Sequence, residues 1–314
     1  MNIVCVEPLG ISESSFQSLQ SEFSAQGNTF TYYMDRREDE ATLTERMRTA
    51  EVAVISNIKL PAAVLQQCPN LRYLSVAFTG LDHIDLAYCK ENNITVQNAA
   101  GYSTVAVSEL AIGLMLDVLR RITVLDGTLR QGGSRGAFLG RELHGKTVGV
   151  VGTGAIGTAT LRLLKAFGCQ LLAYNRSEHA EVKALGVEYT DLDNLMRQSD
   201  IVTLHIPLTP ETHHLISRQR IALMKPNAIL VNTARGNVVD IEALAEALTS
   251  GRIAGAGIDV YEQEPPLPAS HPLLNAPNCV CVPHIGYASR EAFDIRADIV
   301  FDHVRNFLQG QHTK

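Results

Sequence analysis

Short apolar runs rich in β-branched residues alternate along the chain with longer, more polar stretches of helical spacing. In the first third these runs fall at 2–6, 29–33, 52–55, 73–77 and 94–96. The pattern restarts with TVGVVGTGAIG and continues through QLLAYN, IVTLHI, AILVN, AGAGID and CVCVPHIG. Strands that alternate with helices are typical of parallel sheets. The predicted fold class is therefore α/β, with two doubly wound parallel-sheet domains that are Rossmann-like or flavodoxin-like.

Two longer segments predict helices at the boundaries of the domains. A helix is expected over 104–120, opened by Ser103 or Thr104 as N-cap. A second is expected over 289–308, where apolar residues recur on one face. If this last helix returns to the first sheet, the domains are 1–98 plus 286–314, discontinuous, and 99–285. The glycine-rich segment 130–145 is either an exposed subunit-contact arm or a plain loop.

Composition and charge narrow the range of partners. The chain has 314 residues and a formal net charge of −6, which gives no general attraction for nucleic acid or anionic lipid. The longest apolar run, 104–119, carries Glu109 and Asp117, so no membrane span is expected. The N-terminus has no basic segment of a signal peptide, and the six cysteines form no CxxC pair. A cytoplasmic protein without a metal site is predicted.

The sequence GTGAIG follows a predicted strand and opens a predicted helix. Gly152 permits a tight turn, Gly154 lets a pyrophosphate approach the backbone, and Gly157 lets helix and strand pack closely. A GxGxxG motif alone is weak evidence and also occurs in plain turns. The strand before it, the helix after it and a second strand ending at Asn175 favour a dinucleotide-binding domain.

Polar residues follow the last three predicted strands of the second sheet. Arg235 follows AILVN, Asp259 and Glu264 follow AGAGID, and His284 follows CVCV. Alone, such an arginine is typical of a loop charge and such a histidine of a structural position. Because ligands bind beyond the carboxyl ends of parallel strands, their shared position favours one site beside the cofactor.

Taken together these segments resemble the D-isomer-specific 2-hydroxyacid dehydrogenase family over nearly the whole chain. The matching stretches are FTGLDHID, GTGAIG, LHIPLTPETHHLI, NTARGNVVD, GAGIDVYEQEP and PHIGYAS. The resemblance implies a catalytic, substrate-binding domain formed by both chain ends, an inserted Rossmann domain, and an active site in the cleft between them. It also implies a catalytic trio in which Arg235 holds the substrate, His284 is the general acid/base, and Glu264 orients and charges the histidine.

The resemblance further implies contacts with substrate and cofactor. The backbone amides of Thr79 and Gly80 would bind the substrate carboxylate, and Asp259 would lie near the nicotinamide amide. The substrate side chain would face the first domain, around Phe78 and Tyr102. A homodimer is expected. The other implied cofactor contacts are Thr104, Ala155, Ile156, His205, Pro207, Thr212, Thr233, Ala234 and Gly286.

The stretch Asn175, Arg176 and Ser177 bears on the choice between NAD(H) and NADP(H). In NAD sites a carboxylate at the end of the second strand binds the ribose, whereas NADP sites add an arginine. Asn175 stands at the carboxylate position and Arg176 supplies a cation. NADP(H) is therefore predicted to be preferred. In the alternative, Asn175 binds the NAD(H) ribose and Arg176 is solvated, with Glu178 weakening the positive patch.

The predicted function is reduction of a small 2-oxo acid, with glyoxylate and hydroxypyruvate as the leading substrates. Such a reaction needs a proton donor near the carbonyl oxygen and a fixed cation for the carboxylate, which His284 and Arg235 supply. The alternatives within the family are oxidation of 3-phosphoglycerate or of phosphite. An alternative from another class is a non-enzymatic, nucleotide-sensing protein like the corepressors built on this scaffold.

Overall fold

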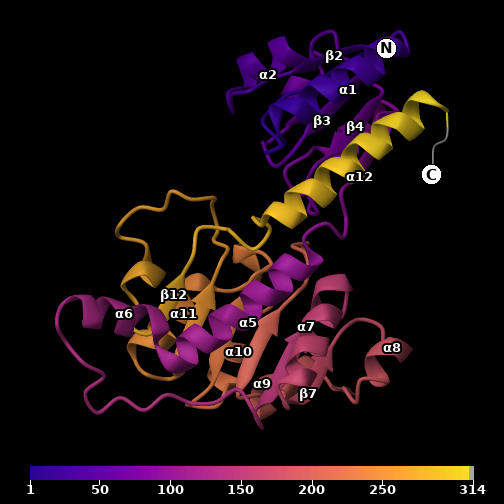
Figure 1. Cartoon of the computed structure of the whole chain (residues 1–314). Helices are drawn as coiled ribbons and strands as arrows, with labels where there is room; N and C mark the ends of the chain where they lie inside the picture. Colours follow the sequence, from indigo (N-terminus) through magenta and orange to yellow (C-terminus); the bar gives the residue numbers. More distant parts are fainter. Residues whose placement is uncertain (311–314) are drawn as a thin grey trace. The chain divides into compact units, whose positions relative to one another are not determined.

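Two separate parallel sheets organise the computed structural model, which describes residues 1–310 (Figure 1). The chain divides into the units Met1–Ser103 with Ala288–Lys314, and Thr104–Tyr287. These boundaries differ slightly from the predicted ones, 98/99 and 285/286. The amide of Ala99 donates to the carbonyls of Val76 and Phe78, which keeps residues 99–103 with the first unit. The last four residues of the predicted range 286–314 lie outside the described residues.

The first unit contains a five-stranded parallel sheet in the order β2-β1-β3-β4-β5. Phe23 of α1, Phe30 of β2 and Phe301 of α12 pack together on one face of this sheet. The helices α2, α3 and α4 contact one another in sequence order. The elements are β1 (Asn2–Cys5), α1 (Glu13–Ala25), β2 (Thr29–Tyr32), α2 (Glu40–Met47), β3 (Val52–Ile55), α3 (Ala62–Leu65), β4 (Tyr73–Val76), α4 (Leu86–Glu91), β5 (Thr95–Asn98) and α12 (Arg290–Leu308).

The second unit contains a seven-stranded parallel sheet in the order β12-β11-β10-β9-β6-β7-β8. Its elements are α5 (Thr104–Arg120), α6 (Ile122–Arg130), β6 (Thr147–Val151), α7 (Ala155–Ala166), β7 (Gln170–Tyr174), α8 (Ala180–Lys183), β8 (Glu188–Tyr189), α9 (Leu192–Gln198), β9 (Ile201–Leu204), α10 (Arg218–Leu223), β10 (Ile229–Asn232), η1 (Gly236–Val238), α11 (Ile241–Thr249), β11 (Gly255–Ile258), η2 (Pro272–Asn275) and β12 (Cys279–Cys281).

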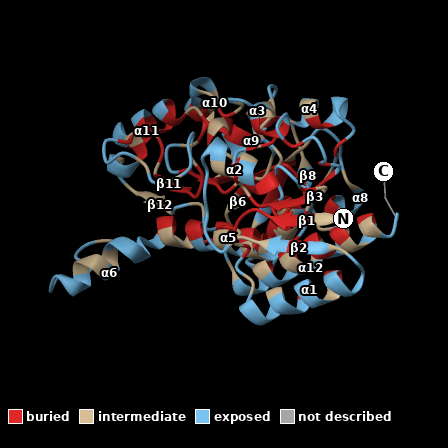
Figure 2. Ribbon diagram, turned by 90° about the horizontal axis from the view of Figure 1, so that it is seen from above, coloured by how far each residue is buried: buried red, intermediate tan, exposed pale blue. Residues whose placement is uncertain are grey.

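Helices bury both faces of the seven-stranded sheet. Apolar residues of α5 and α7 form one core layer with the strands, and residues of α9, α10 and α11 form the other. Figure 2 shows the central strands as buried and the outer helix faces as exposed. A parallel sheet covered on both faces explains why its strands read as nearly continuous apolar runs. The predicted α/β class with two doubly wound sheets is confirmed.

Two predicted helices match the structure closely, and one helix is unexpected. Thr104–Arg120 is helical as predicted, and Ser289 caps α12 by accepting a hydrogen bond from the amide of Ala292. The helix α6, which the sequence did not predict, begins after Arg121, whose left-handed backbone ends α5. None of the helices among residues 1–310 is both long and apolar enough to cross a membrane.

Candidate functional site

The carboxyl edge of the seven-stranded sheet carries most of the predicted site. Numbered from β6, its strand order is the Rossmann order with one further strand, and the order reverses between β6 and β9. The loops after β6 and β9 therefore flank the crevice in which this class of sheet binds a dinucleotide. The loops after β10, β11 and β12 extend along the same edge, because all neighbouring pairs of strands are parallel.

The three glycines after β6 differ in what a side chain would contact at each position. Gly152 has a φ of +97°, and a Cβ there would lie 2.4 Å from the carbonyl oxygen of His205. A Cβ on Gly157 would lie 1.9 Å from the carbonyl oxygen of Gly152. A Cβ on Gly154 would meet nothing within 4 Å, although this residue caps the N-terminus of α7. The backbone is thus open at Gly154, where a pyrophosphate would approach it.

Two buried polar atoms beside this crevice have no hydrogen-bond partner among the described residues. They are the hydroxyl oxygen of Thr233, after β10, and Nδ1 of His205, after β9. The other ring nitrogen of His205 lies 3.0 Å from the Thr203 hydroxyl, and burial lowers the pKa of His205 to about 3, so the ring is neutral. Buried polar groups are normally satisfied. Both atoms therefore fit a bound nicotinamide cofactor that would supply their partners.

The predicted adenosine end of the site begins directly after β7. The side-chain amide of Asn175 donates to the carbonyl of Ser177 at 2.8 Å and lies 3.2 Å from Nε2 of His179. Arg176 is exposed, and its charge helps the Thr209 hydrogen bond to lower the pKa of Glu211. His179 was not predicted as a site residue, because only the turn after β7 places it beside Asn175.

The end of β10 fixes the backbone around Arg235. Asn232 is fully buried, and its side-chain amide donates to the carbonyl of Arg235 at 2.9 Å. Its side-chain oxygen accepts from the amide of Ala234 at 3.0 Å. One guanidinium nitrogen of Arg235 donates to the carbonyl of Ala234 at 2.7 Å. Asn232 was not predicted as a site residue either, although an asparagine at the end of a buried strand can indicate one.

His284 and Glu264 are in direct contact, as the predicted trio requires. Nδ1 of His284 lies 2.9 and 2.8 Å from the two carboxylate oxygens of Glu264. The His284 backbone has a φ of +54°, which is uncommon for a residue with a side chain. With Nδ1 held by the carboxylate, the ring can transfer the proton carried by Nε2.

Asp259 holds the turn that contains His284. Its carboxylate is almost completely buried and accepts from the amides of Ile285 at 2.6 Å and Gly286 at 2.9 Å. Burial raises the pKa of Asp259 to about 6, while these hydrogen bonds and the charge of His284 act in the opposite direction. The contacts fix the residues on the C-terminal side of His284, so its unusual backbone is supported from both β11 and β12.

The other predicted contacts lie on elements of both units. In the second unit Thr104 begins α5, Ala155 and Ile156 begin α7, and the hydroxyl of Thr212 donates to the carbonyl of Pro207 at 2.7 Å. In the first unit Thr79 and Gly80 follow β4, and Asn98 donates to the carbonyl of Thr79.

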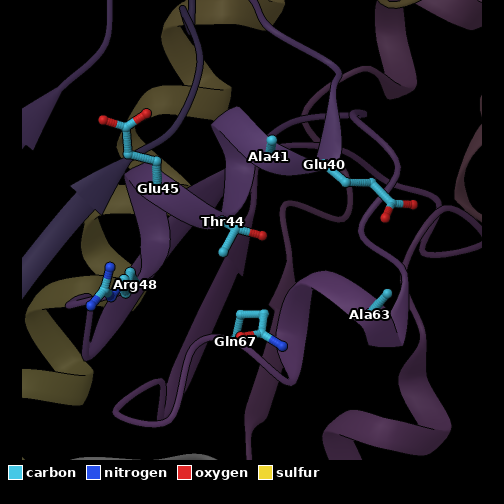
Figure 3. Close-up of a pocket in the computed structure, with 7 residues that line it drawn as sticks. All are labelled: Glu40, Ala41, Thr44, Glu45, Arg48, Ala63 and Gln67. Carbon is cyan, nitrogen blue, oxygen red and sulfur yellow. The ribbon is translucent and has the colours of Figure 1, made fainter.

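A shallow hollow elsewhere in the first unit contains none of the predicted site residues. It lies between α2 and α3 (Figure 3). Its lining is mixed polar and apolar and mostly exposed, and the two carboxylates in it point in different directions. The lining residues are Glu40, Ala41, Thr44, Glu45, Arg48, Ala63 and Gln67.

The chain is similar to known proteins over most of its length. Residues 112–286 match the family described as D-isomer specific 2-hydroxyacid dehydrogenase, NAD binding domain. The chain is 43% identical over 260 residues to a glyoxylate reductase of Thermofilum pendens, covering 81% of this chain and 76% of that protein. It is 40% identical to a D-3-phosphoglycerate dehydrogenase of Methanocaldococcus jannaschii over 86% of this chain, which spans about half, 52%, of that longer relative.

Solved structures match the fold along nearly the whole chain. An acyclic imino acid reductase (Bsp5) in complex with NADPH and D-Arg matches with a TM-score of 0.89 at 28% identity, covering 99% of this chain and 98% of the other. These comparisons confirm the family resemblance that the sequence motifs indicate. They also identify the second unit as one that binds a nicotinamide cofactor.

Proposed function

Because the chain belongs to the D-isomer specific 2-hydroxyacid dehydrogenase family, we propose that it reduces a small 2-oxo acid to the D-2-hydroxy acid. The observation that carries the proposal is the contact between His284 and Glu264 at the carboxyl edge of the seven-stranded sheet. This edge also carries the open glycine loop and the buried unpartnered atoms of Thr233 and His205. A proton donor and a nicotinamide site on one edge are the two requirements of a carbonyl reduction.

In the proposed reaction each residue has one chemical task. The reduced nicotinamide, when bound, supplies a hydride to the carbonyl carbon. His284 gives the proton on Nε2 to the carbonyl oxygen, and Glu264 stabilises the imidazolium through Nδ1. Arg235 binds the substrate carboxylate, for which its planar guanidinium is suited. The amides of Thr79 and Gly80 would bind the same carboxylate.

We propose glyoxylate or hydroxypyruvate as the substrate. The support is that relatives from Thermofilum pendens and Thermotoga maritima, 43% and 42% identical, carry the names glyoxylate reductase and hydroxypyruvate reductase. Oxidation of 3-phosphoglycerate is the second candidate, because the relative from Methanocaldococcus jannaschii carries that activity in its name.

The test is the loss of reduced-cofactor absorbance with a panel of 2-oxo acids. Glyoxylate and hydroxypyruvate should be turned over with a higher kcat/KM than pyruvate or bulkier acids. The reverse reaction should be assayed with 3-phosphoglycerate and with phosphite. Turnover of either of these alone would replace the proposal, and no turnover of any compound would refute it.

We further propose that NADPH is preferred over NADH. Asn175 places a neutral amide at the end of β7, and Arg176 is exposed beside it. Glu178, which could weaken the positive patch, forms an ion pair with Lys183. His179 adds a second basic side chain within reach of Asn175. A 2′-phosphate would therefore meet a cation and hydrogen-bond donors rather than a carboxylate. Glu211 is the opposing charge, since Arg176 also acts on it.

Measuring kcat/KM with both cofactors tests this preference. Wild-type enzyme should favour NADPH, and the double variant Asn175→Asp with Arg176→Ala should shift the preference toward NADH by roughly tenfold or more. The matched control is Arg162→Ala, which removes an exposed arginine paired with Glu181 at 3.5 Å and should leave the ratio unchanged. A wild-type enzyme that favours NADH would contradict the proposal.

We also propose that the protein is a homodimer that associates through α6. This helix has no buried residue, and within the second unit it extends away from the sheet (Figure 2). Its apolar side chains Ile122, Val124 and Leu129 are 56%, 55% and 70% exposed. An amphipathic helix whose apolar side chains are uncovered normally packs against a partner, and a second copy of the same chain offers the same surface.

A further inference from the structure

The first unit has its own topological switch point, between β1 and β3 of the five-stranded sheet. The order β2-β1-β3-β4-β5 is the flavodoxin-like order, in which ligands bind beyond the carboxyl ends of the two strands at the switch point. Here those ends are filled by the protein's own charged and polar groups. Glu7 follows β1, Ser56 follows β3, and both are buried. The amide of Ser56 donates to the Glu7 carboxylate at 2.7 Å.

Arg296 of α12, near the other end of the chain, also lies at the carboxyl ends of β1 and β3. The residue is 3% exposed. Its guanidinium donates to the carbonyl of Leu9 at 2.7 Å, to the hydroxyl of Ser56 at 3.3 Å and to the carbonyl of Ala77 at 3.4 Å. These acceptors follow β1, β3 and β4, so one side chain connects three strand ends.

These contacts belong to a set of hydrogen bonds in which three consecutive carbonyls, those of residues 77–79, accept from protein groups. The carbonyl of Ala77 accepts from both Ser56 and Arg296. The carbonyl of Phe78 accepts from the amide of Ala99 at 3.2 Å, and that of Thr79 accepts from Asn98. The backbone of 77–79, which leads into the proposed substrate-binding amides of Thr79 and Gly80, is therefore fixed at every carbonyl.

Two aromatic rings hold the guanidinium in this position. The centre of the Arg296 guanidinium lies 4.2 Å from the centroid of the Phe293 ring and 5.7 Å from that of Tyr102. Gly10 makes room for the Phe293 ring, because a Cβ at Gly10 would approach it to 2.6 Å. Arg296 thus also contacts Tyr102, beside which the substrate side chain is expected.

Burying a guanidinium between a helix and a sheet costs free energy, because the charge loses its hydration. An apolar side chain of similar length would avoid the loss of hydration. The other inward residues of α12, such as Val300 and Val304, are apolar, so Arg296 is the exception on this face. Part of its charge is balanced by the buried Glu7 carboxylate, whose pKa burial raises while the charges of Arg36 and Arg296 act in the opposite direction. The remaining role of the guanidinium is to satisfy acceptors after β1, β3 and β4, and the carbonyl of Ala77 is the one that begins the loop after β4.

We propose that Arg296 is a positioning residue. It orders the loop 77–80 and thereby determines how tightly the enzyme binds the substrate carboxylate. This inference rests on the proposed function of Thr79 and Gly80. The carboxylate of a 2-oxo acid is bound equally before and during the chemical step. Loss of loop order should therefore raise KM and leave kcat nearly unchanged.

The test compares variants of Arg296 in the full-length enzyme. Arg296→Met keeps an unbranched, flexible side chain but removes the guanidinium donors, so KM for glyoxylate should rise by about tenfold, with kcat changed less than about threefold. Arg296→Lys keeps the charge but reaches fewer acceptors, so its KM should lie between the two. The Kd for the cofactor, measured by fluorescence, should stay at the wild-type value, because the cofactor site lies in the second unit.

The matched control is Arg305→Met in the same helix. Arg305 pairs with Glu22 at 2.6 and 2.8 Å and touches no part of the loop, so its loss should leave KM unchanged. A wild-type KM in Arg296→Met, or an equal rise of KM in Arg305→Met, would overturn the proposal. If Arg296→Met does not fold, Ser56→Ala removes the hydroxyl shared by Arg296 and Ala77 and should give the same rise. A wild-type enzyme with no activity on 2-oxo acids would refute the proposed function instead.

Discussion

Asp259 and Asn232 support the candidate catalytic residues through the backbone. Asp259 accepts from the two amides that follow His284, and Asn232 donates to the carbonyl of Arg235. Asn232 ends β10, Asp259 directly follows β11, and both side chains are buried. The proposed proton donor, His284, and the proposed anion-binding residue, Arg235, are thus anchored to the sheet although they lie in loops. Such anchoring keeps reacting groups in place, and small displacements of them are costly in rate.

The ionised carboxylate of Asp259 destabilises the folded protein above its pKa. Its pKa rises from 3.8 in the unfolded chain to about 6 in the folded one, so the native state binds the proton more tightly. Wild-type stability should therefore fall, relative to Asp259→Asn, as the pH rises from about 4 to about 6, by at most about 3 kcal/mol. Urea unfolding of both proteins at several pH values measures this difference. A difference that is constant with pH would contradict the assigned burial.

At the scale of elements, apolar periodicity predicted the two helices that frame the second unit, but not α6. The segment 122–130 contains β-branched Ile122, Thr123 and Val124 and also Gly127, all of which are poor helix formers. Its N-cap residue, Arg121, is left-handed and offers no capping side chain, and the amide of Thr123 donates instead to Asp117 of α5 at 2.9 Å. Neither the helix propensity of this segment nor its N-cap residue therefore predicts the helix that the structure contains.

The exposed apolar side chains of α6 predict a change of oligomeric state. Leu129→Glu places a charge on the proposed dimer contact and should convert a dimer to a monomer, as measured by light scattering after gel filtration. Met34→Glu is the control, because Met34 is 68% exposed in the first unit and lies outside α6. A wild-type monomer, or a Leu129→Glu variant that stays dimeric, would contradict association through this helix.

At the scale of the whole molecule, the sequence allowed the glycine loop and the polar residues to be placed directly after strands, where the structure has them, while their roles stay predictions. The reason is geometric, since parallel strands bring their carboxyl ends to one edge whatever the loops contain. Arg296 and His179 were not predicted, because their roles depend on contacts that only folding creates. Arg296 reaches Leu9 across almost the entire chain, and no spacing rule links the two. The cleft between the two units stays a prediction.

The most direct measurement is the rate of NADPH-dependent glyoxylate reduction by wild-type enzyme and by His284→Ala. The substitution removes the proposed proton donor and leaves the glycine loop after β6 intact. We predict that kcat falls by roughly 10²–10⁴, the range of general acid catalysis, while cofactor affinity stays nearly unchanged. A His284→Ala enzyme that keeps the wild-type kcat across several pH values would contradict the assignment of His284 as the proton donor.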